Sequence, residues 1–168
     1  MNIFGIAGYS GSGKTTLIEG VLPRLRARGL KVSVIKHTHH DFDLDRPGKD
    51  SWRQREAGAQ EVLLAGAQRW ALMREVRPGE AAPALPQLLA RLAPCDLVLV
   101  EGYKREPIPK LEVHRAELGR DWLYPHDPHI LAVAADVDPP GKKSMRIDIN
   151  DISQLTDFIY YNSGEISC

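Results

Sequence analysis

The chain is 168 residues long, the size of one ordinary domain with a hydrophobic core of its own. Its 22 basic and 22 acidic residues balance, so the overall charge gives no reason to expect nucleic acid or an anionic membrane as a partner. The two cysteines, Cys95 and Cys168, lie far apart, which argues against a disulfide-rich scaffold and fits the reducing cytoplasm. The N-terminus lacks the pattern of a signal peptide, and apolar runs such as residues 130–135 are too short to span a bilayer. We therefore expect a cytoplasmic protein with one domain over residues 1–168.

The predicted elements begin with an apolar strand at residues 2–7, which is followed by a glycine-rich loop and an amphipathic helix at about 14–28. A strand at 31–36 and a long polar stretch come next. The further helices are predicted at 50–59, 84–93 and 151–161, and the further strands at 61–65, 69–75, 96–101, 110–114, 129–135 and 145–149. Several of these strands are apolar throughout, which is typical of a parallel sheet that is covered on both faces.

This pattern predicts the α/β fold class, with a P-loop NTPase-like, mostly parallel sheet and helices on both of its faces. We also expect an antiparallel strand extension of the domain, formed by parts of residues 60–76 and 108–115. Such strands could reach beyond the core sheet and pair with another chain.

The loop from Gly8 to Thr15 reads GYSGSGKT and matches the phosphate-binding pattern G-x-x-x-x-G-K-[ST] at every position. Its glycines let several backbone N–H groups point at one anion, and the N-terminus of the following helix adds its dipole. We expect Lys14 to reach the β- and γ-phosphates of a nucleoside triphosphate, Thr15 to bind Mg²⁺ and Thr16 to face the α-phosphate. The alternative is a chance match in a glycine-rich turn, which the strand before the loop and the helix after it disfavour.

A second carboxylate for the magnesium ion is expected at the carboxyl end of a neighbouring strand. Glu101 ends the apolar run at 97–100 and is therefore at the end of the sheet that carries the loop. Asp96 opens the same strand and belongs to the far end. We predict Glu101 as the magnesium-binding acid, with Gly102 allowing close approach to the γ-phosphate. The alternative is an ordinary acidic residue at the end of a strand.

The strand at 31–36 leads into KHTHHDFDLDRPGKD, which is open to three interpretations. His37 and His39 could be zinc ligands, although no thiolate or compact third ligand accompanies them. The segment could instead be a switch-like loop that senses the γ-phosphate, with Asp45 or Asp50 holding a magnesium-bound water. It could also be a solvated polar loop.

The choice of base is suggested only by Asp136, because the familiar guanine-reading motif N-K-x-D is absent. Asp136 closes the apolar strand ILAVAA at the end of the sheet that carries the loop. A carboxylate there could accept hydrogen bonds from N1 and N2 of guanine, which adenine cannot supply. An acidic residue in a turn before Pro139 and Pro140 is an equally good interpretation.

Several segments together resemble the MobB family, molybdopterin-guanine dinucleotide biosynthesis protein B. They are GYSGSGKTTL, IKHTHHDFDLDRPGKDSWRQREAGA, QRWALM, DLVLVEGYK, AVAADV and DINDI. By position, residues Gly11, Ser12, Gly13, Lys14, Thr15 and Thr16 match the phosphate loop of the family, Lys36 and His37 its second-strand end, Asp50 its GKDS motif and Glu101 its VEG motif. Little of the family pattern is recognisable at 75–94 and 115–128.

The resemblance implies a homodimeric P-loop protein that binds GTP with Mg²⁺ and has weak intrinsic GTPase activity. It implies an adapter that assists MobA, the enzyme that joins a guanylyl group from GTP to molybdopterin. Molybdopterin or molybdoenzyme maturation proteins are the further partners that it implies.

Three function classes follow, and the first is a GTP-binding accessory protein in which Lys14 and Glu101 support slow hydrolysis at most. A small-molecule kinase or ATP-dependent ligase of the same fold is the second, and Lys104, Arg105 and Lys110 could form its basic wall. An interaction protein with a vestigial nucleotide site is the third. The intact Lys14, Thr15 and Glu101 count against that last class.

Overall fold

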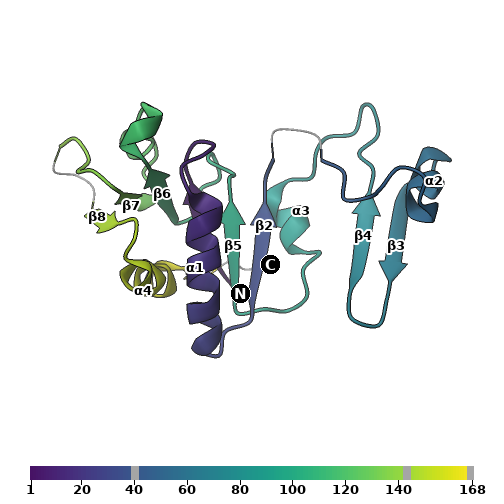
Figure 1. Ribbon diagram of the computed structural model, residues 1–168, viewed down its shortest axis with the longest axis horizontal. Helices are drawn as coiled ribbons and strands as arrows, with labels where there is room; N and C mark the ends of the chain where they lie inside the picture. The colour runs from purple at the N-terminus through teal and green to yellow at the C-terminus, as the bar shows by residue number, and fades with distance from the viewer. Residues whose placement is uncertain (39–41, 142–144, 166–168) are drawn as a thin grey trace. The chain divides into compact units, whose positions relative to one another are not determined.

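The computed structural model of the chain describes residues 1–38, 42–141 and 145–165. The chain divides into two compact units (Figure 1). Unit 1 comprises Met1–His37 and Leu85–Cys168, and unit 2 comprises Thr38–Ala84. Within the described residues, no helix is both long and apolar enough to cross a membrane.

The core of unit 1 is a parallel sheet with the strand order β2-β5-β1-β6-β7-β8. Its strands are β1 (Asn2–Ala7), β2 (Val32–Lys36), β5 (Leu97–Glu101), β6 (Lys110–His114), β7 (Ile130–Ala135) and β8 (Met145–Asp148). A short strand, β9 (Gly164–Glu165), pairs antiparallel with the start of β1. This arrangement confirms the mostly parallel α/β sheet, and it places β1 at the centre with β5 and β6 beside it.

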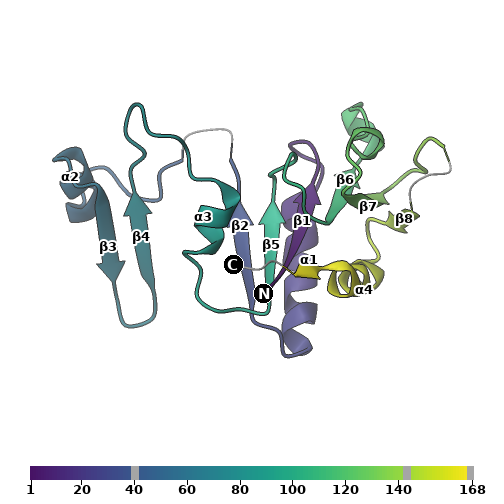
Figure 2. The same ribbon diagram turned by 180° about the vertical axis from the view of Figure 1, so that it is seen from behind.

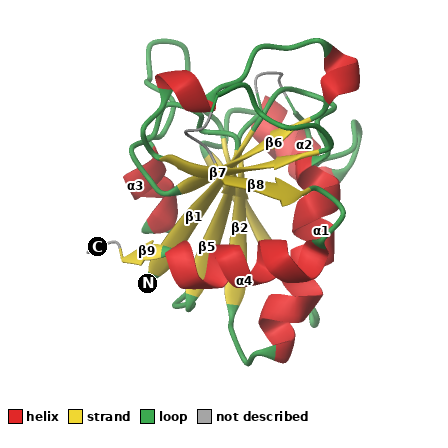
Figure 3. Cartoon of the chain, turned by 90° about the vertical axis from the view of Figure 1, so that its left-hand side faces the viewer, coloured by secondary structure: helices red, strands yellow, loops and turns green. Residues whose placement is uncertain are grey.

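Helices cover both faces of this sheet, because the buried side chains of its central strands alternate between two apolar cores. On one face, Phe4 and Leu99 pack with α1 (Lys14–Ala27) and α4 (Ile152–Asn162). On the other face, Ile3 and Val100 pack with α3 (Leu85–Leu89). Figure 3 shows α1 and α3 on opposite sides of the strands. Two apolar faces on each strand explain why these strands read as continuous apolar runs.

Strand β6 corrects one prediction, because it lies inside the core sheet and not in an antiparallel extension. It pairs in parallel with β1 on one side and with β7 on the other. The polar residues at its alternate positions, Lys110, Glu112 and His114, are all buried. They are buried because the connection from β6 to β7 runs over this face. That connection contains two 3₁₀ turns, η1 (Ala116–Leu118) and η2 (Tyr124–His126).

Unit 2 consists of α2 (Asp50–Glu56) and an antiparallel hairpin of β3 (Glu61–Ala65) and β4 (Trp70–Arg74), as Figure 2 shows. The antiparallel pair is thus confirmed in the 60–76 part of the expected extension. Arg55 of α2 fastens the unit internally through ion pairs to Asp43, Asp45 and Glu75.

Candidate functional site

The phosphate loop joins β1 to α1 in unit 1, in the strand–loop–helix context that its sequence predicts. Gly8 has a φ of 146°, and a Cβ atom at this position would lie 2.5 Å from the carbonyl oxygen of Val113 on β6. Only glycine can therefore turn the chain out of β1 at this point. The first glycine of the motif, Gly8, is needed because β6 lies so close to it.

Lys14 spans the loop, and its Nζ donates a hydrogen bond to the Tyr9 carbonyl oxygen over 2.7 Å. Burial lowers the pKa of the Lys14 ammonium below its usual value, although the nearby Glu101 carboxylate opposes this effect. Thr16 follows in the first turn of α1 and is exposed.

The structure brings Thr15, Lys36 and Glu101 together at the carboxyl ends of three adjacent strands. Strand register explains this, because Glu101 at the end of β5 is opposite Ile6 of β1 and Lys36 of β2. The Thr15 hydroxyl donates a hydrogen bond to Glu101 Oε1 over 3.1 Å. Lys36 Nζ lies 3.4 Å from Thr15 Oγ1 and 3.4 Å from Glu101 Oε1. Glu101 is 6% exposed, so it is a buried carboxylate held between a hydroxyl and an ammonium group.

His37 lies at the same end of the sheet, where its backbone N–H donates to the Glu101 carbonyl oxygen over 2.8 Å. Its ring packs at 4.7 Å from the ring of Tyr103. Gly102 has a φ of 93°, and a Cβ atom there would lie 3.0 Å from the Cβ atom of His37. Glycine is therefore needed after Glu101 to let the ends of β2 and β5 approach each other.

Ser12 provides an independent sign that the loop accommodates a polar ligand. Its side chain is buried, at 1% exposure, within the loop. In the part of the chain that the structure describes, its Oγ is the one buried side-chain polar atom without a hydrogen-bond partner. A buried hydroxyl without a partner costs about 1–3 kcal/mol, which a phosphate oxygen accepting from it would offset. The loop thus contains an unsatisfied hydrogen-bond donor in addition to the phosphate-binding sequence.

Asp136 lies just after β7 at this end of the sheet, as predicted. Its Oδ1 accepts a hydrogen bond from the Ala116 N–H over 3.0 Å, and its Oδ2 lies 3.9 Å from Arg115 Nη1. Arg115 was not among the predicted site residues. Its Nε lies 3.6 Å from where a Cβ atom on Gly13 would be, so the guanidinium group borders the phosphate loop. Recognising Arg115 requires knowing that β6 lies beside β1, which motif spacing does not reveal.

Asp50 is the first residue of α2 and belongs to unit 2. Its role as a ligand of a magnesium-bound water therefore stays a prediction. Asp45, the alternative, is engaged within unit 2, where its Oδ1 accepts from the Ser51 hydroxyl over 2.8 Å and its Oδ2 pairs with Arg55. The zinc interpretation depends on His39, which lies outside the described residues, as does His40.

The basic wall suggested for a kinase or ligase divides into two kinds of residue. Lys110 is fully buried, and its Nζ donates to the carbonyl oxygens of Lys104 and Glu106. It therefore has a structural role. Lys104 instead extends toward the phosphate loop, where its Nζ lies 4.1 Å from the centroid of the Tyr9 ring.

A central β1, a phosphate loop between β1 and α1, and a carboxylate at the end of the adjacent β5 define a P-loop NTPase-like protein. The sequence pattern of the family described as molybdopterin guanine dinucleotide synthesis protein B matches residues 3–136. The chain belongs to this family, MobB.

Relatives of known name agree with this assignment over nearly the whole chain. A molybdopterin-guanine dinucleotide biosynthesis adapter protein of Haemophilus influenzae is 48% identical over 157 residues, which cover 94% of this chain and 86% of the relative. A protein of the same name from Escherichia coli is 45% identical over 160 residues, 94% of this chain and 90% of the relative. The crystal structure of a MobB homolog from Bacillus stearothermophilus matches with a TM-score of 0.73 at 29% identity, covering 96% of this chain and 97% of that one.

Proposed function

We propose that this protein is a GTP-binding accessory protein of molybdenum cofactor biosynthesis. In this role it assists the attachment of GMP to molybdopterin, which forms molybdopterin guanine dinucleotide. The Haemophilus influenzae and Escherichia coli relatives are named as adapter proteins of this biosynthesis, which supports the proposal. Its partners would be a MobA-like guanylyltransferase and molybdopterin or molybdoenzyme maturation proteins, in the cytoplasm.

The cluster of Thr15, Lys36 and Glu101 is the observation that carries nucleotide binding. A hydroxyl and a carboxylate oxygen 3.1 Å apart suit the oxygen ligands that Mg²⁺ prefers, and these two residues would hold the ion. Lys14 and Lys36 would bind phosphate oxygens, and Asp50 stays the candidate for a magnesium-bound water. Bound magnesium neutralises negative charge on the phosphates.

Asp136 is our candidate for the selection of guanine over adenine. Its carboxylate lies at the end of the sheet that carries the phosphate loop, and Arg115 borders both the loop and this carboxylate. We expect Asp136→Ala to bind GTP at least about tenfold more weakly, since a hydrogen bond to a charged group contributes about 1.5–3 kcal/mol, and to bind ATP as before. Unchanged discrimination between GTP and ATP would reject this role.

Hydrolysis is proposed to be slow, because the residues near Glu101 lack the parts that make fast GTPases. Gly102, Tyr103 and Lys104 follow Glu101, so no glutamine is in place there to orient an attacking water. Arg55 pairs with three carboxylates inside unit 2 and is therefore a poor candidate for an arginine finger. Lys14 and Glu101 stay the candidates for whatever catalysis occurs.

A homodimer is the assembly that we propose, with the hairpin of unit 2 as its interface. Leu63, Trp70 and Leu72 share one face of the hairpin, because Leu63 is opposite Leu72 and Ala65 is opposite Trp70. These three side chains are 59%, 65% and 39% exposed. A patch of large apolar side chains on a two-stranded sheet favours burial against a second copy. Sedimentation at micromolar concentration tests this, and a monomer would contradict it.

The test of the proposed function is calorimetric titration of GTP and ATP with Mg²⁺, repeated with a MobA-like guanylyltransferase present. We expect GTP to bind more tightly, to be hydrolysed slowly, and to increase the yield of molybdopterin guanine dinucleotide made by the partner. The alternative, a small-molecule kinase or ATP-dependent ligase, requires rapid phosphoryl or acyl transfer to an acceptor. Fast turnover with an acceptor, and no effect on the guanylyltransferase, would overturn the proposal.

A further inference from the structure

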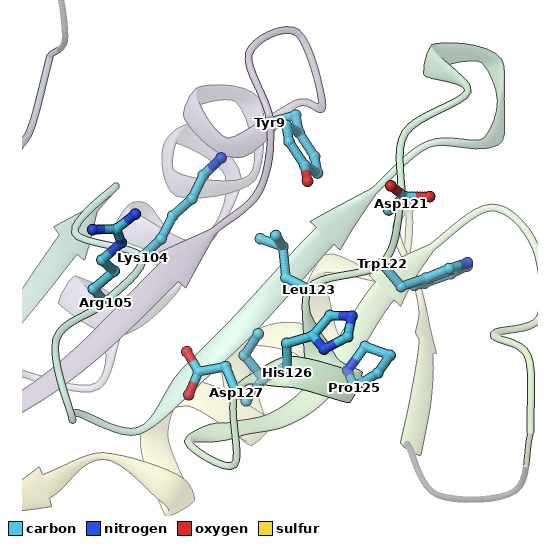
Figure 4. A pocket seen from close by; sticks show the side chains of 10 residues that line it. Tyr9, Lys104, Arg105, Asp121, Trp122, Leu123, Pro125, His126 and Asp127 are labelled. Atoms are coloured by element: carbon cyan, nitrogen blue, oxygen red, sulfur yellow. The ribbon is translucent and has the colours of Figure 1, made fainter.

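Unit 1 contains a cavity of about 580 Å³ beside the phosphate loop, and the proposed function makes no use of it so far. It lies between the residues that follow β5 and the segment that precedes β7 (Figure 4). Its lining includes Tyr9, Lys104, Arg105, Asp121, Trp122 and His126. This volume is within the range of pockets that bind small molecules, about 300–1,000 Å³.

The buried polar side chains of β6 hold the walls of this cavity in place. Glu112 is fully buried, and its two carboxylate oxygens accept hydrogen bonds from the backbone N–H groups of Leu123 and Tyr124 over 2.9 and 2.8 Å. His114 stacks on Trp122 with ring centroids 3.7 Å apart. These two contacts fix the wall formed by residues 121–124.

Lys110 fixes both walls at once. Its Nζ donates to the carbonyl oxygens of Lys104 and Glu106 over 2.8 and 2.7 Å on the β5 side, and it pairs with Asp127 at 2.5 Å on the β7 side. Apolar residues could fill the same space without the desolvation cost of buried charges. The three buried polar side chains of β6, Lys110, Glu112 and His114, therefore hold the walls of the cavity in place.

The side chains that face the cavity differ in chemistry between its two sides. Lys104 and Arg105 place two cations on one side, Asp121 places a carboxylate on the other, and the second carboxylate of the lining, Asp127, is paired with Lys110 (Figure 4). Among the described residues, no carboxylate lies within salt-bridge distance of Lys104, whose ammonium group instead lies over the ring of Tyr9. Aromatic rings from Tyr9 and His126 lie between the two sides. Such a lining suits a planar ring system with an anionic group at one end and N–H donors at the other.

Tyr9 connects this cavity to the phosphate loop. Its carbonyl oxygen accepts the hydrogen bond from Lys14, while its ring points from the loop into the cavity. A ligand in the cavity and a nucleotide on the loop would thus share one residue as a common wall.

We propose that this cavity binds a pterin that carries a phosphate group, with the phosphate on Lys104 and Arg105 and the aminopyrimidinone edge toward Asp121. The proposal rests on the proposed function, which supplies the reason to expect a pterin next to a guanine nucleotide. A pterin held there lies against the residue that also contacts Lys14, so the adapter holds both partners of the guanylylation near each other.

Calorimetric titration with neopterin 3′-phosphate and with neopterin tests the cavity, with the phosphate loop first saturated by GDP and Mg²⁺. We expect one phosphorylated pterin to bind per chain, and Lys104→Ala to weaken its binding by about tenfold or more. The same substitution leaves the weaker binding of neopterin unchanged, because neopterin lacks the phosphate. Lys31→Ala, a matched change at an exposed lysine of unit 1, should alter neither ligand. Asp121→Asn should weaken both pterins alike.

Equal binding of the two pterins, no effect of Lys104→Ala, or displacement of the phosphorylated pterin by GDP would each overturn the proposal. Titration of GTP alone separates this result from the proposed function. Binding of GTP without binding of the phosphorylated pterin would remove only the cavity proposal. Binding of the phosphorylated pterin through Lys104 without binding of GTP would remove the proposed function and leave the cavity site in place.

Discussion

The substitution Ser12→Ala should stabilise the ligand-free protein while weakening its binding of GTP. The Ser12 hydroxyl is buried without a hydrogen-bond partner among the described residues, and its desolvation costs about 1–3 kcal/mol. Alanine keeps the Cβ atom, so the substitution removes the unsatisfied oxygen and leaves only a small void. We therefore expect the free energy of unfolding to rise by about 1–3 kcal/mol without ligand.

We expect a phosphate bound in the loop to accept a hydrogen bond from the same hydroxyl group. A hydrogen bond to a charged group contributes about 1.5–3 kcal/mol, so we expect GTP to bind Ser12→Ala roughly 10- to 150-fold more weakly. The two effects have opposite signs and come from one atom, which a purely structural role for Ser12 cannot produce.

Urea unfolding monitored by tryptophan fluorescence measures the first effect. Trp122 is the one tryptophan of unit 1, so replacing Trp52 and Trp70 with phenylalanine makes the signal report on that unit alone. Calorimetry with GTP measures the second effect. Ser10→Ala is the matched control, because Ser10 is an exposed serine of the same loop and should change stability by less than about 0.5 kcal/mol. Destabilisation of ligand-free Ser12→Ala, with unchanged GTP affinity, would refute the reasoning.

Three further predictions concern the metal, the cavity wall and the dimer. Glu101→Gln should abolish the Mg²⁺ dependence of GTP affinity, whereas Asp96→Asn, at the other end of β5, should preserve it. Calorimetric titration of GTP with and without Mg²⁺ measures this dependence in both variants. Burial raises the pKa of Glu112, so its contribution to stability is present below its ordinary value of 4.5 and is lost as the pH rises through the higher folded value. The stability of the wild type relative to Glu112→Gln should therefore fall as the pH rises above 4.5 in urea titrations, and parallel pH profiles would contradict this. Trp70→Ser should raise the dimer dissociation constant by about tenfold or more in sedimentation, while Leu64→Ser, on the opposite hairpin face, should change it less.

The sequence predicted the parallel sheet, and it predicted that the phosphate loop and Glu101 lie at one end of that sheet, because both follow from local patterns. Strands such as 97–101 and 130–135 are apolar throughout, which identifies buried parallel strands, and the loop motif has a fixed spacing. Glu101 could be placed beside the phosphate loop because the end of a strand can be assigned to one edge of a parallel sheet. Placing Glu101 in this way requires only the direction of each strand.

The place of β6 in the sheet could not be predicted in the same way. Alternation of polar and apolar residues in KLEVH is typical of a strand with one solvent-exposed face. Only the path of the 115–129 connection shows that this face is covered. Arg115 was missed as a neighbour of the phosphate loop for a related reason. Its proximity depends on strand order and on the route of a long connection, and neither leaves a periodic signal.

Two groups of buried polar side chains in unit 1 carry a desolvation cost, and they lie on either side of Tyr9. On one side, Ser12 keeps a buried hydroxyl without a partner among the described residues; on the other, β6 buries Lys110 and Glu112 to hold the walls of a cavity. A protein selected only to fold would replace all three with apolar or smaller side chains at little cost. A phosphate on the loop would offset the cost at Ser12, whereas Lys110 and Glu112 are compensated within the chain by their own hydrogen bonds and the ion pair with Asp127. Because a ligand that binds only the folded state stabilises it, the proposed nucleotide and pterin would together make the protein most stable when both are bound, which suits an adapter.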